Sequence, residues 1–255
     1  MQTDEKLNFA RQLVLQAACQ LREDQRQQLP SLLAAQRAEK KIISQIRRRF
    51  HRQRFLDGQT TEDDLSGPVW ILDPLAGKIN YEIWGCHYAI SLAYYEEGQP
   101  VFGLIADVQR EDLYTGVNMA GAWKNDTALP VLTGDKSLSE CVAEISLDSV
   151  AELKRRRGIQ LEKLGPLLRA HRSTGCAALS LCQIAQGQLD LMLSARLSPQ
   201  HYAAAVILLN ETQAVWGLPF QRRALISSSP TVFLAASQRT LYTQLVNQYL
   251  SVNRL

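Results

Sequence analysis

Five extended apolar segments follow one another between residues 69 and 131, joined mostly by short polar turns. They are VWILD (69–73), HYAISLAYYEEG (87–98), PVFGLIADVQ (100–109), EDLYTGVNM (111–119) and GAWKNDTALPV (121–131). Runs rich in β-branched and aromatic residues that are bounded by such turns are typical of strands. Because short connections make neighbouring strands run in opposite directions, the sequence predicts an antiparallel sheet. The last segment predicts a hairpin at its edge.

Two amphipathic helices are predicted before this sheet. Apolar residues recur at helical spacing over residues 5–22 and again over 31–49, and Pro30 separates the two segments. Residues 51–68 are polar and acidic and contain two glycines and a proline, which predicts a loop.

The chain changes character after about residue 140, where helices and strands begin to alternate. The predicted elements are strands over 141–147 and 189–195, helices over 174–188, 198–214 and 240–250, and one or two strands before the last helix. Ser198 and Pro199 are typical of an N-cap and a first helical position. The order predicts an α/β (α+β) fold in one compact unit, with residues 1–140 as one half and 141–255 as the other.

Composition limits the class of protein. With 46% hydrophobic and 21% charged residues, the 255-residue chain is expected to fold around a large core. A net charge of +3 is too small to imply a nucleic-acid partner by itself. The five scattered cysteines form no CxxC pair, which argues against zinc and fits reduced thiols in the cytoplasm. The sequence shows no signal-peptide pattern and no apolar run of about 18 residues, so no membrane association is expected.

The segment WILDPLAGKINY, residues 70–81, contains the first candidate site. It reads as a buried strand that ends at an acid, Asp73, followed by a turn at Gly77. An acid at the end of a strand beside a glycine turn is frequent in metal and phosphate sites. However, Ala76 stands where a second acid would complete such a site, and Lys78 follows the glycine. The segment predicts either an active site or the remnant of one.

WILDPLAGKINY resembles the W-[IV]-[IV]-D-P-[IL]-D-G-T-x-N-[FY] motif of the inositol monophosphatase family, the Mg²⁺-dependent, lithium-sensitive phosphomonoesterases. Other segments resemble the family in the same order along nearly the whole chain. They are RFHRQRFLDGQ (49–59), residues 87–126, STGCAALSLCQIAQGQLD (173–190) and RLSPQHYAAAVILLNETQA (196–214). The resemblance implies a layered α-β-α-β-α fold and a homodimer.

The resemblance also implies where the family's Mg²⁺ ligands fall, and most of those positions hold other residues. The first Asp of the motif is kept as Asp73, a weak remnant of the metal site, and a carbonyl ligand falls on Leu75. Family acids fall on Gln59, Ala76 and His201, and a water-orienting Thr falls on Lys78. Mg²⁺ requires hard oxygen ligands and is repelled by an ammonium group. The family match therefore implies a degenerate member without a metal cofactor.

The predicted pocket is then a vestigial one that can bind a ligand. Its residues are Gln59, Asp73, Leu75, Ala76, Gly77, Lys78, Gly175 and His201. Lys78 either binds an anion such as phosphate or pairs with Asp73, and the pairing is the preferred interpretation. His201 could serve as a ligand for a softer metal or as an acid/base group, although no metal-spaced cluster surrounds it in the sequence.

Three functions remain open. The preferred one is a catalytically inactive pseudo-phosphatase with a binding, scaffolding or regulatory role, sensing a phosphorylated small molecule or acting with a protein partner. The alternative is an active, Mg²⁺-dependent phosphomonoesterase acting on inositol phosphate or another sugar phosphate, with Glu62, Asp63 or Asp64 as extra ligands. The second alternative is a nucleic-acid or transcription-complex binder. It rests on the basic runs 47–54 and 154–158 and on family members with such a second role, but solvated helix ends are the preferred interpretation of these runs.

Overall fold

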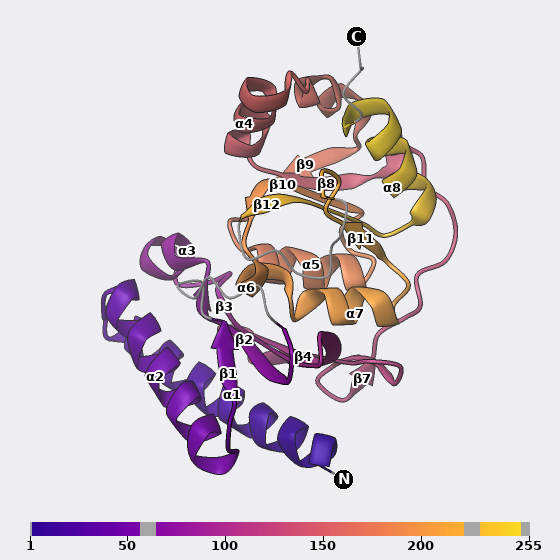
Figure 1. The fold of residues 1–255 in the computed structure, drawn as a ribbon. Helices are drawn as coiled ribbons and strands as arrows, with labels where there is room; N and C mark the ends of the chain where they lie inside the picture. The colour runs from indigo at the N-terminus through magenta and orange to yellow at the C-terminus, as the bar shows by residue number, and fades with distance from the viewer. Residues whose placement is uncertain (1, 57–64, 222–229, 251–255) are drawn as a thin grey trace.

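The computed structural model describes residues 2–56, 65–221 and 230–250, which form alternating layers of helices and sheets (Figure 1). From one side to the other, α1 (Gln2–Arg26) and α2 (Ser31–Arg49) cover the first sheet, α5 (Ala177–Ala185), α6 (Pro199–Tyr202) and α7 (Ala205–Glu211) lie between the sheets, and α4 (Leu147–Arg157) and α8 (Arg239–Leu245) cover the second sheet. The layers follow the predicted α-β-α-β-α order. None of the helices in the described ranges is both long and apolar enough to span a membrane.

Seven strands of the described chain form the first sheet, in chain order. They are β1 (Arg54–Leu56), β2 (Pro68–Ala76), β3 (Ala89–Glu96), β4 (Gln99–Asp107), β5 (Asp112–Val117), β6 (Gly121–Lys124) and β7 (Thr127–Ala128). From β2 to β7 all neighbours are antiparallel, which confirms the predicted sheet and its edge hairpin. Strand β1 corrects the predicted loop over 51–68, because it pairs with β2 in parallel. Three residues are too few for a strand periodicity to be visible in the sequence.

The second sheet has the strand order β11-β12-β10-β8-β9 among the described residues. These strands are β8 (Val142–Ile145), β9 (Ala170–Arg172), β10 (Leu191–Leu197), β11 (Val215–Gly217) and β12 (Thr231–Ala236). Strand β8 is parallel to β9 and β10, whereas β12 is antiparallel to β10 and β11. The remaining elements are α3 (Lys78–Ile83), the 3₁₀ turns Leu138–Glu140, Leu161–Lys163 and Gly165–Leu167, and the π-helical turn Val246–Leu250.

The single helix predicted over 198–214 is in fact two helices. Pro199 is the first residue of α6, as predicted, but the helix ends at Tyr202 and α7 begins at Ala205. The break lets α6 contact β2 while α7 packs across β4 and β5. Because both contacts are made to the distant first sheet, the break has no local sequence signal.

Glycines in the first sheet set the distance between that sheet and α7. A Cβ atom at Gly103 would lie 2.3 Å from the carbonyl oxygen of Ala204, and one at Gly116 would lie 2.9 Å from the backbone nitrogen of Leu208. Only a residue without a side chain permits this approach. The helix layer can therefore cover β4 and β5 closely, and the central strands are buried on both faces, which explains their nearly continuous apolar sequence.

Each of the two basic runs contributes the last turn of a helix, as the sequence indicates. Arg47, Arg48 and Arg49 form the last turn of α2, and Lys154 to Arg157 form that of α4, where they complement the helix dipoles. Several are paired: Arg49 with Glu5, Lys154 with Glu162, and Arg155 and Arg156 with Glu152.

Candidate functional site

Strand β2 brings Asp73 to the centre of the molecule. The strand pairs with β3 as far as Asp73, opposite Ser91, and its register then shifts before Ala76. Within this irregularity, Oδ1 of Asp73 accepts a hydrogen bond from the backbone N–H of Leu75 at 3.2 Å. The aspartate is only 5% exposed, and its other oxygen, Oδ2, is buried without a hydrogen bond to any described residue.

The chain then turns at Gly77 into the short helix α3. Gly77 has φ +82°, and a Cβ atom there would lie 2.8 Å from the carbonyl oxygen of His87, so only glycine fits. Lys78 is the first residue of α3 and is exposed. Within the described part of the chain, its ammonium group makes no hydrogen bond and no ion pair. The turn thus places the Lys78 ammonium, which has no ion pair with a described residue, five residues after the buried carboxyl of Asp73.

A chain of hydrogen bonds connects α3 to the second sheet. The side-chain amide of Asn80 donates to the carbonyl oxygens of His87, at 2.8 Å, and Thr174, at 2.7 Å. The backbone N–H of Thr174 donates in turn to Oε1 of Glu144, on β8, at 2.7 Å. Gly175 follows with φ +78° and packs against Asn80, where a Cβ atom would lie 3.1 Å from Oδ1. The network fixes the two halves of the site relative to each other.

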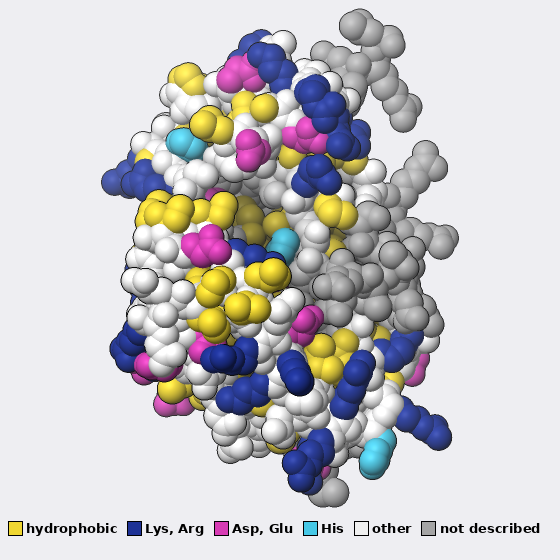
Figure 2. Space-filling view, turned by 90° about the vertical axis from the view of Figure 1, so that its left-hand side faces the viewer, with side chains coloured by type: hydrophobic (Ala, Val, Ile, Leu, Met, Phe, Trp, Pro, Cys, Tyr) yellow, Lys and Arg dark blue, Asp and Glu magenta, His cyan; other side chains and the backbone are white. Residues whose placement is uncertain are grey.

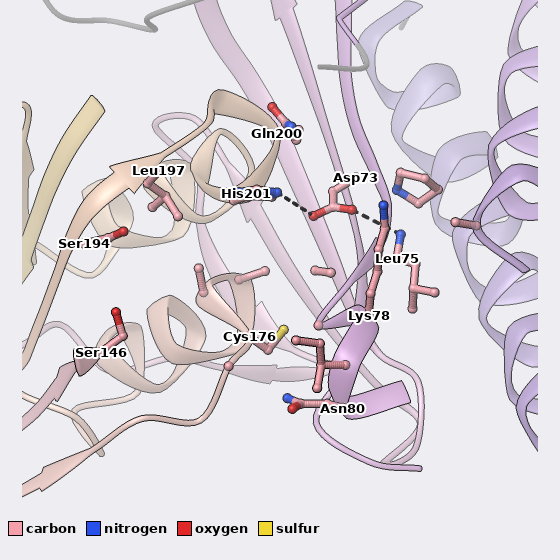
Figure 3. Close-up of a pocket in the computed structure, with 18 of the residues that line it drawn as sticks. Asp73, Leu75, Lys78, Asn80, Ser146, Cys176, Ser194, Leu197, Gln200 and His201 are labelled. Atoms are coloured by element: carbon pink, nitrogen blue, oxygen red, sulfur yellow. Dashed lines mark hydrogen bonds and ion pairs between the residues drawn. The ribbon is translucent and has the colours of Figure 1, made fainter. Parts of the chain in front are cut away.

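The second half of the site contributes His201, on α6. Its Nε2 lies 3.5 Å from Oδ2 of Asp73, and the imidazole is partly exposed (Figure 3). The predicted pairing of Lys78 with Asp73 is therefore wrong, because α6 packs on β2 and brings His201 to the carboxyl instead. Burial raises the pKa of Asp73 above its ordinary value, and the charges of His201 and Lys78 offset this only in part.

These residues line a cavity of about 670 Å³ between the two halves of the chain. Figure 2 shows it as a hollow with a histidine and a basic side chain at its base and hydrophobic side chains around its rim. Seven of the eight predicted pocket residues line it: Asp73, Leu75, Ala76, Gly77, Lys78, Gly175 and His201. The eighth, Gln59, lies outside the described residues.

The cavity also contains polar residues that were not among the predicted pocket residues. They are Glu39, Glu144, Ser146, Ser149, Ser173, Ser194, Asn80, Gln36 and Gln200. A signal for Glu144 was present in the sequence, since it is the one charged residue in the strand segment CVAEISL. The serines have no such signal, because their position in the cavity wall depends on how β8, β10 and α4 pack.

Cys176 lies at the start of α5 and also lines the cavity. Burial raises the pKa of its thiol to about 12. Since the thiolate is the nucleophilic form of cysteine, Cys176 is protonated at neutral pH and packs as an apolar side chain.

The acidic and imidazole groups of the described residues form no cluster of metal ligands. Among these residues, no three histidine, cysteine, aspartate or glutamate side chains gather closely enough to hold a metal ion. Ala76 offers no side-chain oxygen, and the Asp73 carboxyl contacts the Leu75 N–H with one oxygen and faces His201 with the other. The loop acids Glu62, Asp63 and Asp64 lie outside the described residues.

Comparison with known proteins agrees with this architecture. The structure is similar to that of inositol monophosphatase II from Staphylococcus aureus, with a TM-score of 0.86 and 23% identity, covering 96% of this chain and 93% of that one. The fold is thus the inositol monophosphatase fold. Residues 6–251 match the model of the inositol monophosphatase family, and the chain belongs to that family.

The chain is also similar in sequence to an inositol-1-monophosphatase and to a protein named Nus factor SuhB. The chain is 32% identical over 216 residues to the inositol-1-monophosphatase of Bacillus subtilis, which covers 81% of each chain. It is 29% identical over 177 residues to the Nus factor SuhB of Xylella fastidiosa, covering 68% of this chain and 63% of that protein.

Proposed function

We propose that this protein is a pseudo-phosphatase that binds a phosphorylated small molecule in the cavity without Mg²⁺ and does not hydrolyse it. The observation that supports this most directly is the Asp73–His201 pair. The family resemblance places an acidic metal ligand at His201, and here that position presents an imidazole to Asp73, the kept acid of the motif.

Anion binding is supported by Lys78. Its ammonium is exposed in the cavity and makes no hydrogen bond or ion pair with any described residue, so a ligand phosphate would meet an available positive charge. Lysine binds phosphate as a compact point charge and does not impose a planar geometry on its ligand. Serine and amide side chains on the opposite wall supply donors and acceptors for the rest of the ligand.

Hydrolysis in this fold depends on divalent cations that polarise the phosphate and activate water. Three carboxyl groups of the described residues line the cavity, but no cluster of three metal-binding side chains forms among these residues, and the charge of Lys78 acts on Asp73, which makes a poor environment for a doubly charged ion. The proposed role is therefore binding, whether for sensing, scaffolding or regulation of a protein partner.

The active phosphomonoesterase remains the competing function, because the chain is 32% identical to a protein named inositol-1-monophosphatase. The two proposals predict opposite results in one pair of measurements. Phosphate release from inositol 1-phosphate is followed with Mg²⁺ and with a chelator, and the melting temperature is followed with the same ester in the absence of divalent ions. We expect no release and a raised melting temperature. Release that needs Mg²⁺ and is inhibited by Li⁺ would contradict the pseudo-phosphatase.

Homodimerisation, a cytoplasmic location and a protein partner remain predictions, and light scattering and affinity purification of the full chain test the first and the last. Nucleic-acid binding is the weaker alternative, supported by the similarity to a protein named Nus factor. It predicts an affinity for RNA or DNA that falls steeply with salt.

A further inference from the structure

In the cavity lining, the side chain of Glu144 has a described hydrogen-bond partner for one of its two carboxyl oxygens. Glu144 is 7% exposed and lines the cavity from β8. Its Oε1 accepts the hydrogen bond from the Thr174 N–H, but Oε2 is buried and has no hydrogen-bond partner among the described residues. Glutamine would accept the same bond with a neutral side chain. Because a buried charge without a partner is costly, the second oxygen points to a role beyond holding Thr174.

The charged groups around the cavity do not match a simple phosphate ester. In the described part of its lining, the Asp73 carboxyl faces His201, Oε2 of Glu144 has no hydrogen-bond partner, and Lys78 supplies an ammonium group. A phosphate monoester adds about −1.5 to −2 charges at neutral pH. Electrostatic interactions are stronger in a partly desolvated cavity than in water. A ligand with only negative charge would be attracted by Lys78 and repelled by Glu144.

A hydrogen-bond network connects the helix that carries Lys78 to the strand that carries Glu144. Lys78 and Asn80 are two residues apart on α3, Asn80 donates to the carbonyl of Thr174, and the N–H of Thr174 donates to Glu144. Figure 3 shows Lys78 and Asn80 on one short element beside Cys176. Because Lys78 and Glu144 line the same cavity, one ligand that spans it can carry an anionic group to Lys78 and a cationic group toward Glu144.

We infer that the ligand of this cavity is zwitterionic, a phosphate ester that also carries a protonated amine, and that Glu144 selects for the amine. The inference rests on the proposed function, since it names the chemical class of ligand bound at that site. The ligand ammonium supplies a positive charge for Glu144, while Lys78 holds the phosphate. Glu144 acts on the amine through its electrostatic potential, since its unpaired oxygen is buried.

Glucosamine 6-phosphate and glucose 6-phosphate test this inference, because they differ in one amino group in place of a hydroxyl. Their affinities are measured by titration calorimetry with the full chain at pH 6.5 and without divalent ions. We expect glucosamine 6-phosphate to bind about tenfold more tightly, as one additional charge interaction in a partly buried site allows. Glu144→Gln keeps the acceptor for Thr174 and is expected to remove this preference. Glu97→Gln, at the exposed β3–β4 turn, removes a carboxyl elsewhere and is expected to retain it.

The outcomes separate the two proposals. Equal affinity of the wild-type protein for the two esters overturns the zwitterion inference and leaves the proposed function intact. An amine preference that persists in Glu144→Gln overturns the assignment of Glu144. Binding of neither ester overturns the proposed function and, with it, this inference. A melting temperature for Glu144→Gln close to that of the wild type shows that the change in preference does not come from unfolding.

Discussion

The imidazole Nε2 of His201 lies 3.5 Å from Oδ2 of Asp73, and this contact joins α6 to the end of β2. It brings together two residues that are 128 positions apart in the sequence. Burial nevertheless raises the pKa of Asp73 above its ordinary value, because the loss of solvation is the largest influence and the nearby positive groups compensate only in part. The site therefore keeps a carboxyl that is unfavourable for stability, which is typical of residues retained for function.

Replacing Asp73 with asparagine is expected to stabilise the protein at neutral pH. Since the pKa of Asp73 is raised in the folded state, folding favours the neutral carboxyl. The cost of the charged form is absent below the unfolded pKa, near 3.8, grows as pH rises toward the folded pKa, and stays constant above it. We expect Asp73→Asn to raise the free energy of unfolding by about 1 kcal/mol at pH 7.

Urea unfolding at pH 7 and pH 4.5 measures this effect, and the gain should shrink at the lower pH. Asp126→Asn, at the exposed β6–β7 turn, is the control and should change stability little at either pH. A destabilised Asp73→Asn protein at pH 7 would show that the contact with His201 outweighs burial.

Removing the charge of Lys78 should weaken anion binding without lowering stability. Lys78→Met deletes an exposed ammonium that has no partner among the described residues. We expect the affinity for inositol 1-phosphate to fall about tenfold, because one charge-assisted contact is lost. Calorimetry measures the affinity, and Lys163→Met, at an exposed lysine outside the cavity, is the matched control. Unchanged affinity in Lys78→Met would place the anion elsewhere.

Restoring acids should restore a response to Mg²⁺. The triple variant Ala76→Asp, Lys78→Thr and His201→Asp places oxygens at three positions that line the cavity with Asp73. We expect millimolar Mg²⁺ to raise its melting temperature by a few degrees, as binding to the folded state alone requires. The wild type and the single variant Lys78→Thr are expected to show no such rise. If the wild type responds to Mg²⁺ equally, the metal site is not lost.

The close approach of α7 to the first sheet predicts a strong effect of one methyl group. In Gly103→Ala the new Cβ atom would lie 2.3 Å from the backbone oxygen of Ala204, which cannot move aside as a side chain can. We expect a loss of about 2–3 kcal/mol in the free energy of unfolding, which urea denaturation measures. At Gly165 a new methyl group would meet no atom within 4 Å beyond its chain neighbours, so Gly165→Ala should be nearly neutral. Similar losses in both variants would contradict this packing.

Much of the architecture could be predicted because its signals are local. The helix predicted over 31–49 has the bounds Ser31–Arg49, since its apolar spacing and Pro30 mark both the buried face and the start. The antiparallel strands β2 to β6 follow from apolar runs and polar turns. By contrast, β1 and the break between α6 and α7 depend on contacts with distant strands, and the sequence predicted neither.

The candidate site divides in the same way. The chemical groups available at the site could be read from the sequence, because it contains the motif around Asp73 and the residues at positions 76, 78 and 201. How these groups meet depends on the packing: Asp73 faces His201, Lys78 makes no ion pair with a described residue, and Glu144 lines the cavity while it accepts a hydrogen bond from Thr174. The physical reason is that a side chain's partners and its degree of burial are set by packing between segments far apart in sequence, which no local pattern records.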